Sequence, residues 1–272
     1  MTASPPHLSW LTDSSRRVRT KDGAEIAIWT LNHVPNAMIL SAWAKHFRNH
    51  YCDDKQIDLL RKGTSHSRAE YLLQLKFPDA SKSPGPSIRS GDFAEVLIAD
   101  YVEFLLGYWV PRTRYDDKTV RNESKKGSDV LGFRFQRADK WSPSDTLLIF
   151  ESKAQLSGKK AGSIMQEAID HSAKDELRKA ESLNAVKQRL INRNETERVE
   201  WVERFQNQED RPYKSLYGAA AIFTSEIFDE AVLKTSDAST HPHKPRLSLL
   251  VITGPKLMEL VHQLYDLAAC EA

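Results

Sequence analysis

Asp129, Glu151 and Lys153 are three charged residues that lie next to apolar stretches of the sequence. Glu151 and Lys153 follow the apolar run 147–150 and are separated by one residue, so on a strand their side chains point to the same face. Asp129 stands at the start of a second apolar stretch. Carboxylate oxygens are the ligands that Mg²⁺ prefers, and a neighbouring ammonium group can orient a water or help to deprotonate it. The three residues therefore predict metal-assisted hydrolysis of a phosphodiester. Asp129 and Glu151 would bind Mg²⁺, and Lys153, its pKa lowered by the cation, would act on the attacking water.

Each of these residues also has an ordinary structural interpretation. Glu151 and Lys153 could form a salt bridge on an exposed edge strand, although the apolar run before them favours a buried central strand. Asp129 could be a turn residue, because it follows Gly127 and Ser128 and Asp is common in turns. The chemical interpretation is favoured because all three residues occur together and in this order.

The periodicity of apolar residues predicts the elements that must position these side chains. Residues 90–106 have apolar side chains at helical spacing, and Glu95 lies on this expected helix. Three strands, two polar helices, two apolar strands and a closing helix are expected after it, over 108–114, 129–136, 146–152, 162–193, 195–207, 217–224, 247–253 and 257–268. The order α-β-β-β-α-α-β-β-α predicts an α/β fold class.

The beginning of the chain predicts a separate α+β region over residues 1–77. Asp22-Gly23 is a strong turn signal between two alternating stretches, which indicates a hairpin over 15–32, and helical patterns follow it. Residues 78–87 are rich in Pro, Ser and Gly and predict a linker. The main domain is expected over 88–272, with a charged helical insertion over 162–211 that carries little core material. This insertion is either a solvated hairpin or a docking element.

The acid, the acid-x-lysine and the order of elements together resemble the PD-(D/E)XK nuclease superfamily of restriction enzymes and repair nucleases. In this resemblance, which covers roughly residues 88–225, Asp129 matches the first catalytic acid, and Glu151 and Lys153 match the second acid and the lysine. The segment from Gly91 to Glu95 matches a Gly-x-x-x-Glu start, which implies that Glu95 completes the metal site. Taken alone, Glu95 could also be an exposed helix acid or act at the first turn of the helix. The resemblance implies a nuclease-like core, with a mixed central sheet flanked by helices, and a Mg²⁺-dependent deoxyribonuclease in which Mn²⁺ can substitute.

A closer resemblance covers nearly the whole chain. The segments RSGDFAEVLIADYV, KKGSDVLGF and IFESKAQLSG resemble the nuclease subunit of Hachiman-type anti-phage defence systems. That family implies a DNA substrate and a superfamily-2 helicase as partner subunit. The sequence departs from many RecB-like members, which carry Gln-x-x-x-Tyr after the lysine, because here Gln166 is followed by Asp170. RecB-like handling of DNA ends is therefore not implied.

Five polar residues around the expected site are predicted to contact DNA: Lys125, Lys126, Gln155, Lys159 and Lys160. The lysines lie in expected loops, where they could bind phosphate oxygens, and Gln155 shares the strand face of Lys153 if the strand continues. Charged loop residues are commonly only solvated, and a polar residue at a strand end is often structural.

Composition limits the other classes of function. The net charge of the 272-residue chain is only +2, so DNA contact must come from local patches or from a partner. No run of ~18 apolar residues occurs, which argues against a membrane span. Cys52 and Cys270 form no CxxC pair and suit a reducing cytoplasm. His46 and His50 have zinc-like spacing, but without a third ligand we interpret them as ordinary histidines.

Taken with the resemblance to the Hachiman nuclease subunit, these residues imply a Mg²⁺-dependent DNA nuclease that acts in cytoplasmic anti-phage defence with a helicase partner. Two alternatives stay open: an inactive nuclease-fold subunit for assembly or binding, and a stand-alone restriction or repair endonuclease. The presence of Glu95 beside Asp129, Glu151 and Lys153 argues against the first alternative. The low net charge and the absence of a recognisable DNA-reading motif disfavour sequence-specific cutting.

Overall fold

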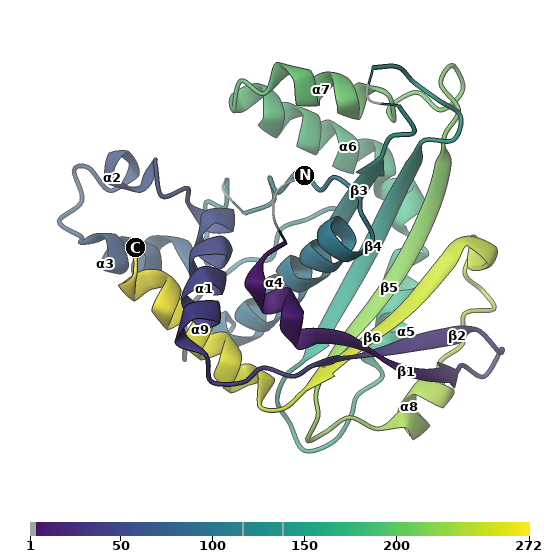
Figure 1. Cartoon of the computed structure of the whole chain (residues 1–272), viewed down its shortest axis with the longest axis horizontal. Helices are drawn as coiled ribbons and strands as arrows, with labels where there is room; N and C mark the ends of the chain where they lie inside the picture. Colours follow the sequence, from purple (N-terminus) through teal and green to yellow (C-terminus); the bar gives the residue numbers. More distant parts are fainter. Residues whose placement is uncertain (1–3, 116, 138) are drawn as a thin grey trace.

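The centre of the molecule is a six-stranded mixed sheet in the order β1-β2-β6-β5-β4-β3 (Figure 1). The computed structural model describes residues 4–115, 117–137 and 139–272, so the first three residues of the predicted N-terminal region lie outside it. The β1–β2 and β3–β4 pairs are antiparallel, and β2–β6, β6–β5 and β5–β4 are parallel. The strands are β1 (Leu11–Arg19), β2 (Glu25–Leu31), β3 (Val130–Arg134), β4 (Thr146–Gln155), β5 (Lys214–Thr224) and β6 (Leu247–Gly254).

Helices cover both faces of this sheet (Figure 1), which confirms the predicted α/β class with a mixed sheet flanked by helices. One face packs against α1 (Ala37–Tyr51), α4 (Gly85–Asp100) and α9 (Leu257–Cys270). The other packs against α5 (Ile164–Ser172), α6 (Asp175–Asn192) and α7 (Thr196–Glu203). Short helices are α2 (Ile57–Leu60), α3 (Arg68–Tyr71) and α8 (Glu230–Lys234). Within the described residues, no helix combines the length and the apolar character that a membrane span needs.

Alternation of side chains along β4 assigns its residues to the two faces. Leu148 and Phe150 belong to the core under α1, α4 and α9, whereas Leu147 and Ile149 belong to the core under α6 and α7. A strand that is buried on both faces has to be apolar at every position, as the run 147–150 is. The first polar position after it, Glu151, continues on the face of Ile149.

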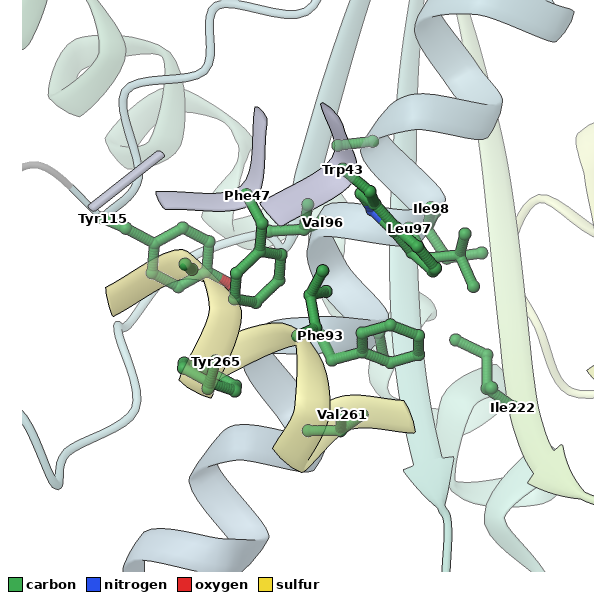
Figure 2. Packing of buried hydrophobic residues seen from close by; sticks show 14 of the residues in the cluster. Trp43, Phe47, Phe93, Val96, Leu97, Ile98, Tyr115, Ile222, Val261 and Tyr265 are labelled. Atoms are coloured by element: carbon green, nitrogen blue, oxygen red, sulfur yellow. The ribbon is translucent and has the colours of Figure 1, made fainter. Parts of the chain in front are cut away.

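The core around α4 is built from aromatic side chains of three helices (Figure 2). Trp43 and Phe47 of α1, Phe93 of α4 and Tyr265 of α9 are each at most 1% exposed. The rings of Phe47 and Tyr265 meet edge to face, with centroids 4.9 Å apart, which is a favourable arrangement of aromatic pairs. This packing fixes α4 between the sheet and two helices.

The predicted hairpin at the N-terminus is confirmed, and its second strand extends the central sheet. β2 pairs in parallel with β6, with Ile28 opposite Val251, and α1 packs against α9 through Phe47 and Tyr265. Within the predicted linker 78–87, helix α4 already begins at Gly85. The division of the chain at this linker stays a prediction, while the sheet itself runs across it.

The strand expected over 108–114 is wrong. Only Trp109 pairs with a neighbouring strand, through an isolated bridge to Phe133, and the rest of the segment is irregular. Pro111 has no N–H for a ladder, and Arg112 has a left-handed backbone with φ of +53°. The segment begins with Tyr, Trp and Val, which favour strands, but Pro111 and Arg112 cannot continue one.

The insertion 162–211 carries more core material than its charges indicate. It forms three helices, and α6 and α7 bury Leu183, Val186, Leu190 and Val202 against the face of β3 and β4. The predicted helix 162–193 is interrupted between α5 and α6. The insertion is therefore a packed layer of the fold and not only a solvated hairpin.

Candidate active site

Glu151 and Lys153 lie together on β4, on the same face as predicted. Lys153 Nζ is 2.5 Å from Glu151 Oε1, and His171 Nδ1 of α5 is 3.3 Å from the same oxygen. The side chain of Glu151 is 4% exposed and that of Lys153 is 25% exposed. Since β4 lies between β3 and β5, the pair is not an exposed salt bridge on an edge strand.

Asp129 lies directly before β3, opposite Glu151. The last paired residues of the two strands are Val130 and Phe150, and in an antiparallel pair the next residue on each strand is again opposite the other. Asp129 Oδ2 accepts a hydrogen bond of 3.0 Å from the backbone N–H of Ser152. The turn before it requires Gly127, whose φ of +97° is rarely adopted by residues with a Cβ.

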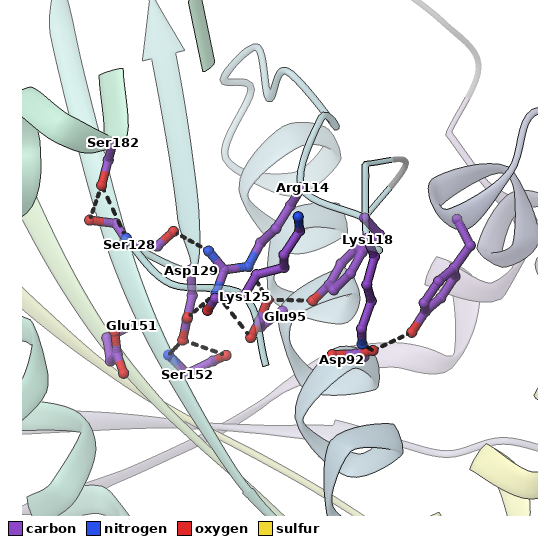
Figure 3. A network of polar contacts seen from close by, with 12 residues as sticks. Asp92, Glu95, Arg114, Lys118, Lys125, Ser128, Asp129, Glu151, Ser152 and Ser182 are labelled. Carbon is purple, nitrogen blue, oxygen red and sulfur yellow. Dashed lines mark hydrogen bonds and ion pairs between the residues drawn. The ribbon is translucent and has the colours of Figure 1, made fainter. Parts of the chain in front are cut away.

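Ser128 ties this turn to the helical insertion. Its hydroxyl donates to Asp175 Oδ1 at 2.9 Å, and its N–H donates to Ser182 Oγ at 3.1 Å; Figure 3 shows the Ser182 contact. Asp175 is buried, and among the described residues its Oδ2 has no hydrogen-bond partner. Burial raises the pKa of Asp175 to about 7; the hydrogen bond from Ser128 opposes this rise and Asp129 adds to it. The insertion thus places a fourth acid near the predicted three.

Glu95 of α4 is connected to Asp129 by an arginine (Figure 3). Arg114 Nε is 2.5 Å from Glu95 Oε2, and Arg114 Nη2 is 3.0 Å from Asp129 Oδ1. The hydroxyl of Tyr115 also donates to Glu95. The side chains of Glu95, Arg114 and Asp129 are only 10–14% exposed, so these ion pairs are largely shielded from water.

Burial raises the pKa of two carboxylates of the site, and the charge of Asp129 adds to both rises. Burial raises the pKa of Glu95 to about 8; Arg114 opposes this rise and Asp129 adds to it. Burial also raises the pKa of Glu151 to about 7, again with a contribution from Asp129. For Lys153, burial lowers the pKa but the Glu151 carboxylate outweighs it, so the pKa is raised overall. The lowering predicted above depends on the charge of a bound cation and stays a prediction.

The chemistry of this donor set fits Mg²⁺. Three largely buried carboxylates provide hard oxygen ligands, and a divalent cation would supply the positive charge that such a group of acids lacks. The present arrangement is more open than a closed cation site. Among the described residues, the ligand atoms of Glu95, Asp129 and Glu151 do not all lie within 4.8 Å of one another, whereas those of His46, His50 and Asp100 do. Asp129 and Glu151, which are opposite each other, are the residues that would hold the ion.

Metal binding is expected to strengthen as the pH rises through the pKa values of these acids, about 7 for Glu151 and about 8 for Glu95. Protons compete with the cation for carboxylate oxygens, so the affinity should increase by roughly tenfold or more between about pH 6 and pH 8.5. Because both acids have raised pKa values in the folded state, the protein without metal should lose stability over the same interval. Calorimetric titration with Mn²⁺ at several pH values measures the first effect and urea unfolding the second. A constant or falling affinity would exclude these acids as ligands.

His46 and His50 surround a different buried acid, Asp100 at the end of α4. His46 Nε2 is 2.8 Å from Asp100 Oδ1, and Arg112 Nη2 is 2.7 Å from the same oxygen. Asp100 is fully buried. Since the guanidinium already supplies positive charge at this carboxylate, we interpret the cluster as a polar network of the core and not as a metal site.

A cavity of about 250 Å³ lies beside Arg114. Its walls come from α4, the segment 110–115, the start of β3 and α6, and include Glu95, Asp129, Lys126 and Val186. The cavity therefore reaches two of the predicted acids from the side of the helical insertion.

The residues predicted to contact DNA lie in loops and at a strand end near the site: Lys125, Lys126, Gln155, Lys159 and Lys160. Gln155 ends β4 as predicted, and its amide holds the following loop, with hydrogen bonds of 2.9 Å to the carbonyl of Lys160 and 2.7 Å from the N–H of Gly162. Lys125 pairs with Asp117 at 2.8 Å. Gln155 thus shapes a loop with exposed lysines, and the DNA contacts stay predictions.

The sequence analysis did not identify Arg114, Tyr115 or Asp175 as site residues. Arg114 is the last residue of the segment that was expected to be a strand, Tyr115 follows it, and Asp175 lies in the middle of an expected helix. The one available signal is the pair Arg112 and Arg114, two cations that follow an apolar stretch.

Comparison with known protein families supports one of the resemblances. The HamA family model matches residues 5–268, which include all the site residues described above. None of the curated proteins matches the chain. The predicted relation to Hachiman defence is confirmed, while placement in the PD-(D/E)XK superfamily stays a prediction. The chain belongs to the HamA family, the defence subunit of the Hachiman system.

Proposed function

We propose that this chain is a Mg²⁺-dependent DNA nuclease that acts in anti-phage defence together with a helicase subunit. The observation that carries the proposal is the buried pair Glu151 and Lys153 on β4, opposite Asp129, in a chain of the HamA family. A carboxylate and an ammonium group on one face, beside a second carboxylate, are the groups that metal-assisted phosphodiester hydrolysis requires. The order of these residues agrees with the PD-(D/E)XK pattern.

The residues of the chain have distinct roles in this proposal. Mg²⁺ bound at the site would neutralise charge on the phosphodiester and activate a water. Asp129 and Glu151 would hold the cation. The N–H of Ser152 positions Asp129, and Lys153 pairs with Glu151. Lys153 orients the attacking water through its ammonium group. Glu95 contributes from α4 when its carboxylate is free.

Family membership supports a partner, and the charge of the chain indicates what the partner supplies. The net charge of +2 gives little long-range attraction to DNA. A helicase that grips DNA would bring the strand to the site, where the lysines of the two loops contact phosphates. The proposed setting is the bacterial cytoplasm, where DNA and such a partner meet.

A second candidate function is a non-catalytic assembly subunit. It is favoured by one observation: Arg114 already neutralises charge at Glu95 and Asp129, so this part of the site forms a complete polar network without a metal ion. The Glu151–Lys153 pair is not needed for such a network, which is why we prefer the nuclease.

The purified chain is expected to cut plasmid and linear DNA when Mg²⁺ or Mn²⁺ is present, alone or with its Hachiman helicase and ATP. The acids and the phosphate are both negatively charged, so a divalent cation is needed between them to offset their repulsion. Gel analysis of the products, with EDTA as the control, measures this. Absence of cutting by both the chain and the complex would favour the assembly subunit.

A further inference from the structure

We propose that Arg114 is an internal counter-ion of the candidate active site. It holds Glu95 and Asp129 in a resting arrangement, and it leaves them when the site takes up its divalent cation. This inference rests on the metal-dependent activity proposed above and adds the regulation of that same site.

All three nitrogens of the Arg114 guanidinium donate hydrogen bonds to groups around the site. Besides its contacts with Glu95 and Asp129, Nη1 donates to the carbonyl of Ser128 at 2.8 Å and Nη2 donates to the carbonyl of Lys125 at 3.0 Å. These acceptors belong to the turn that carries Asp129. Arg114 therefore joins α4 to the start of β3, and it contacts two of the three residues predicted to bind metal.

Arg114 and a divalent cation compete for the same carboxylates. Mg²⁺ needs its oxygen ligands at about 2.1 Å in near-octahedral geometry, whereas Glu95 and Asp129 here direct oxygens at the guanidinium. The positive charge of Arg114 also repels an approaching cation in this shielded place. Binding of an ion by both acids therefore requires that Arg114 withdraw.

The surroundings of Arg114 permit such a movement. The cavity of about 250 Å³ is lined by Arg114 itself and lies between α4 and α6, so the guanidinium has space beside its present position. Arg114 follows Pro111 in the irregular segment, and no sheet hydrogen bond of this segment beyond Trp109 would break. The consequence is a site with low affinity for metal until Arg114 has moved, which would restrain a nuclease in an uninfected cell.

Arg112 offers a matched control, because it is the neighbouring arginine of the same segment and lines the same cavity. It pairs with Asp100, the last residue of α4, and with Glu103 just after this helix, each at 2.7 Å. Replacing Arg112 or Arg114 by Gln therefore removes the same charge from the same wall. Only Arg114 contacts the predicted ligands.

The test is a titration of the full-length chain with Mn²⁺ and Mg²⁺. Calorimetry measures the affinity, and the metal-induced rise in melting temperature gives a second, independent readout. Arg114→Gln is expected to bind metal at least about tenfold more tightly than the wild type, because the competing cation is gone. Its melting temperature should be lower without metal and should rise more when metal is added. Arg112→Gln should lower the melting temperature but leave the metal affinity within about twofold.

Three outcomes separate this inference from the proposed function. If the wild type binds metal and Arg114→Gln binds no more tightly, the internal counter-ion is wrong and the nuclease proposal stands. If neither protein binds metal, both are wrong. An equal gain for Arg112→Gln would show a general charge effect and would overturn the specific role of Arg114. Should Arg114→Gln not fold, Arg114→Met, which keeps a long side chain without its charge, must still show tighter metal binding than the wild type.

Discussion

Glu151→Gln and Lys153→Ala are each expected to reduce the rate of metal-dependent DNA cleavage by about 10²- to 10³-fold or more. Glu151 faces Asp129 and would lose its charge as a ligand, while the amide keeps the shape of the side chain. Lys153 lies 2.5 Å from Glu151, and its removal takes away the ammonium group that orients the water. Cleavage assays under single-turnover conditions measure the chemical step directly.

The two variants should differ in metal binding, which assigns the roles. Glu151→Gln is expected to weaken Mn²⁺ binding, whereas Lys153→Ala should bind Mn²⁺ at least as well as the wild type because a nearby positive charge is lost. The double variant should be no worse than about the poorer single variant, since residues that act as a unit are not additive. Glu25→Gln, at an exposed position of β2, is the matched control and should retain full activity. Retained cleavage in Lys153→Ala would remove Lys153 from the mechanism.

Asp92→Ala is expected to lower the free energy of unfolding by about 3–5 kcal/mol. Asp92 lies one helical turn before Glu95 and accepts from Lys118 Nζ at 2.7 Å and from the hydroxyl of Tyr51 at 2.6 Å, as Figure 3 shows in part. The side chains of Asp92 and Lys118 are 3% and 1% exposed. Truncation would leave the ammonium of Lys118 buried without its counter-charge.

Urea unfolding followed by circular dichroism measures this loss. Asp266→Asn is the matched control, because Asp266 is exposed on α9 next to Tyr265, and its replacement should change the stability by less than about 0.5 kcal/mol. Replacing Asp92 and Lys118 together by Ala should be less destabilising than the sum of the single changes, since neither charge is then left alone. An Asp92→Ala protein of normal stability would contradict the buried ion pair.

The parts of the fold that local pattern determines could be predicted from the sequence. The run 147–150 predicts a strand buried on both faces, and alternation then places Glu151 and Lys153 together, which the structure confirms. Asp22-Gly23 predicts the hairpin for the same reason, because turn chemistry is local. The pairing of β2 with β6 could not be predicted in this way, since the two strands are far apart in sequence and their parallel contact has no local signal.

The candidate site was only partly predictable for a related physical reason. Asp129 and Glu151 could be predicted because each lies next to the apolar run of an expected strand. Arg114 lies in an irregular segment, where no periodicity indicates which way a side chain points. Asp175 depends on the break between α5 and α6, in a stretch whose composition favours one continuous helix. Tertiary packing of Leu183 and Val186 decides how that stretch lies on the sheet.

The position of β6 between β2 and β5 has a consequence for how the molecule is made. Both neighbours are synthesised before β6, so until residues 247–254 have been added each of them exposes an unpaired strand edge. The sheet closes only when residues 247–254 have emerged and inserted between them, and folding that depends on such distant contacts is slow. A chain that ends prematurely therefore cannot complete its sheet. The six-stranded framework that includes β3 and β4, where the acids and the lysine lie, is therefore complete only after residues 247–254 have been added.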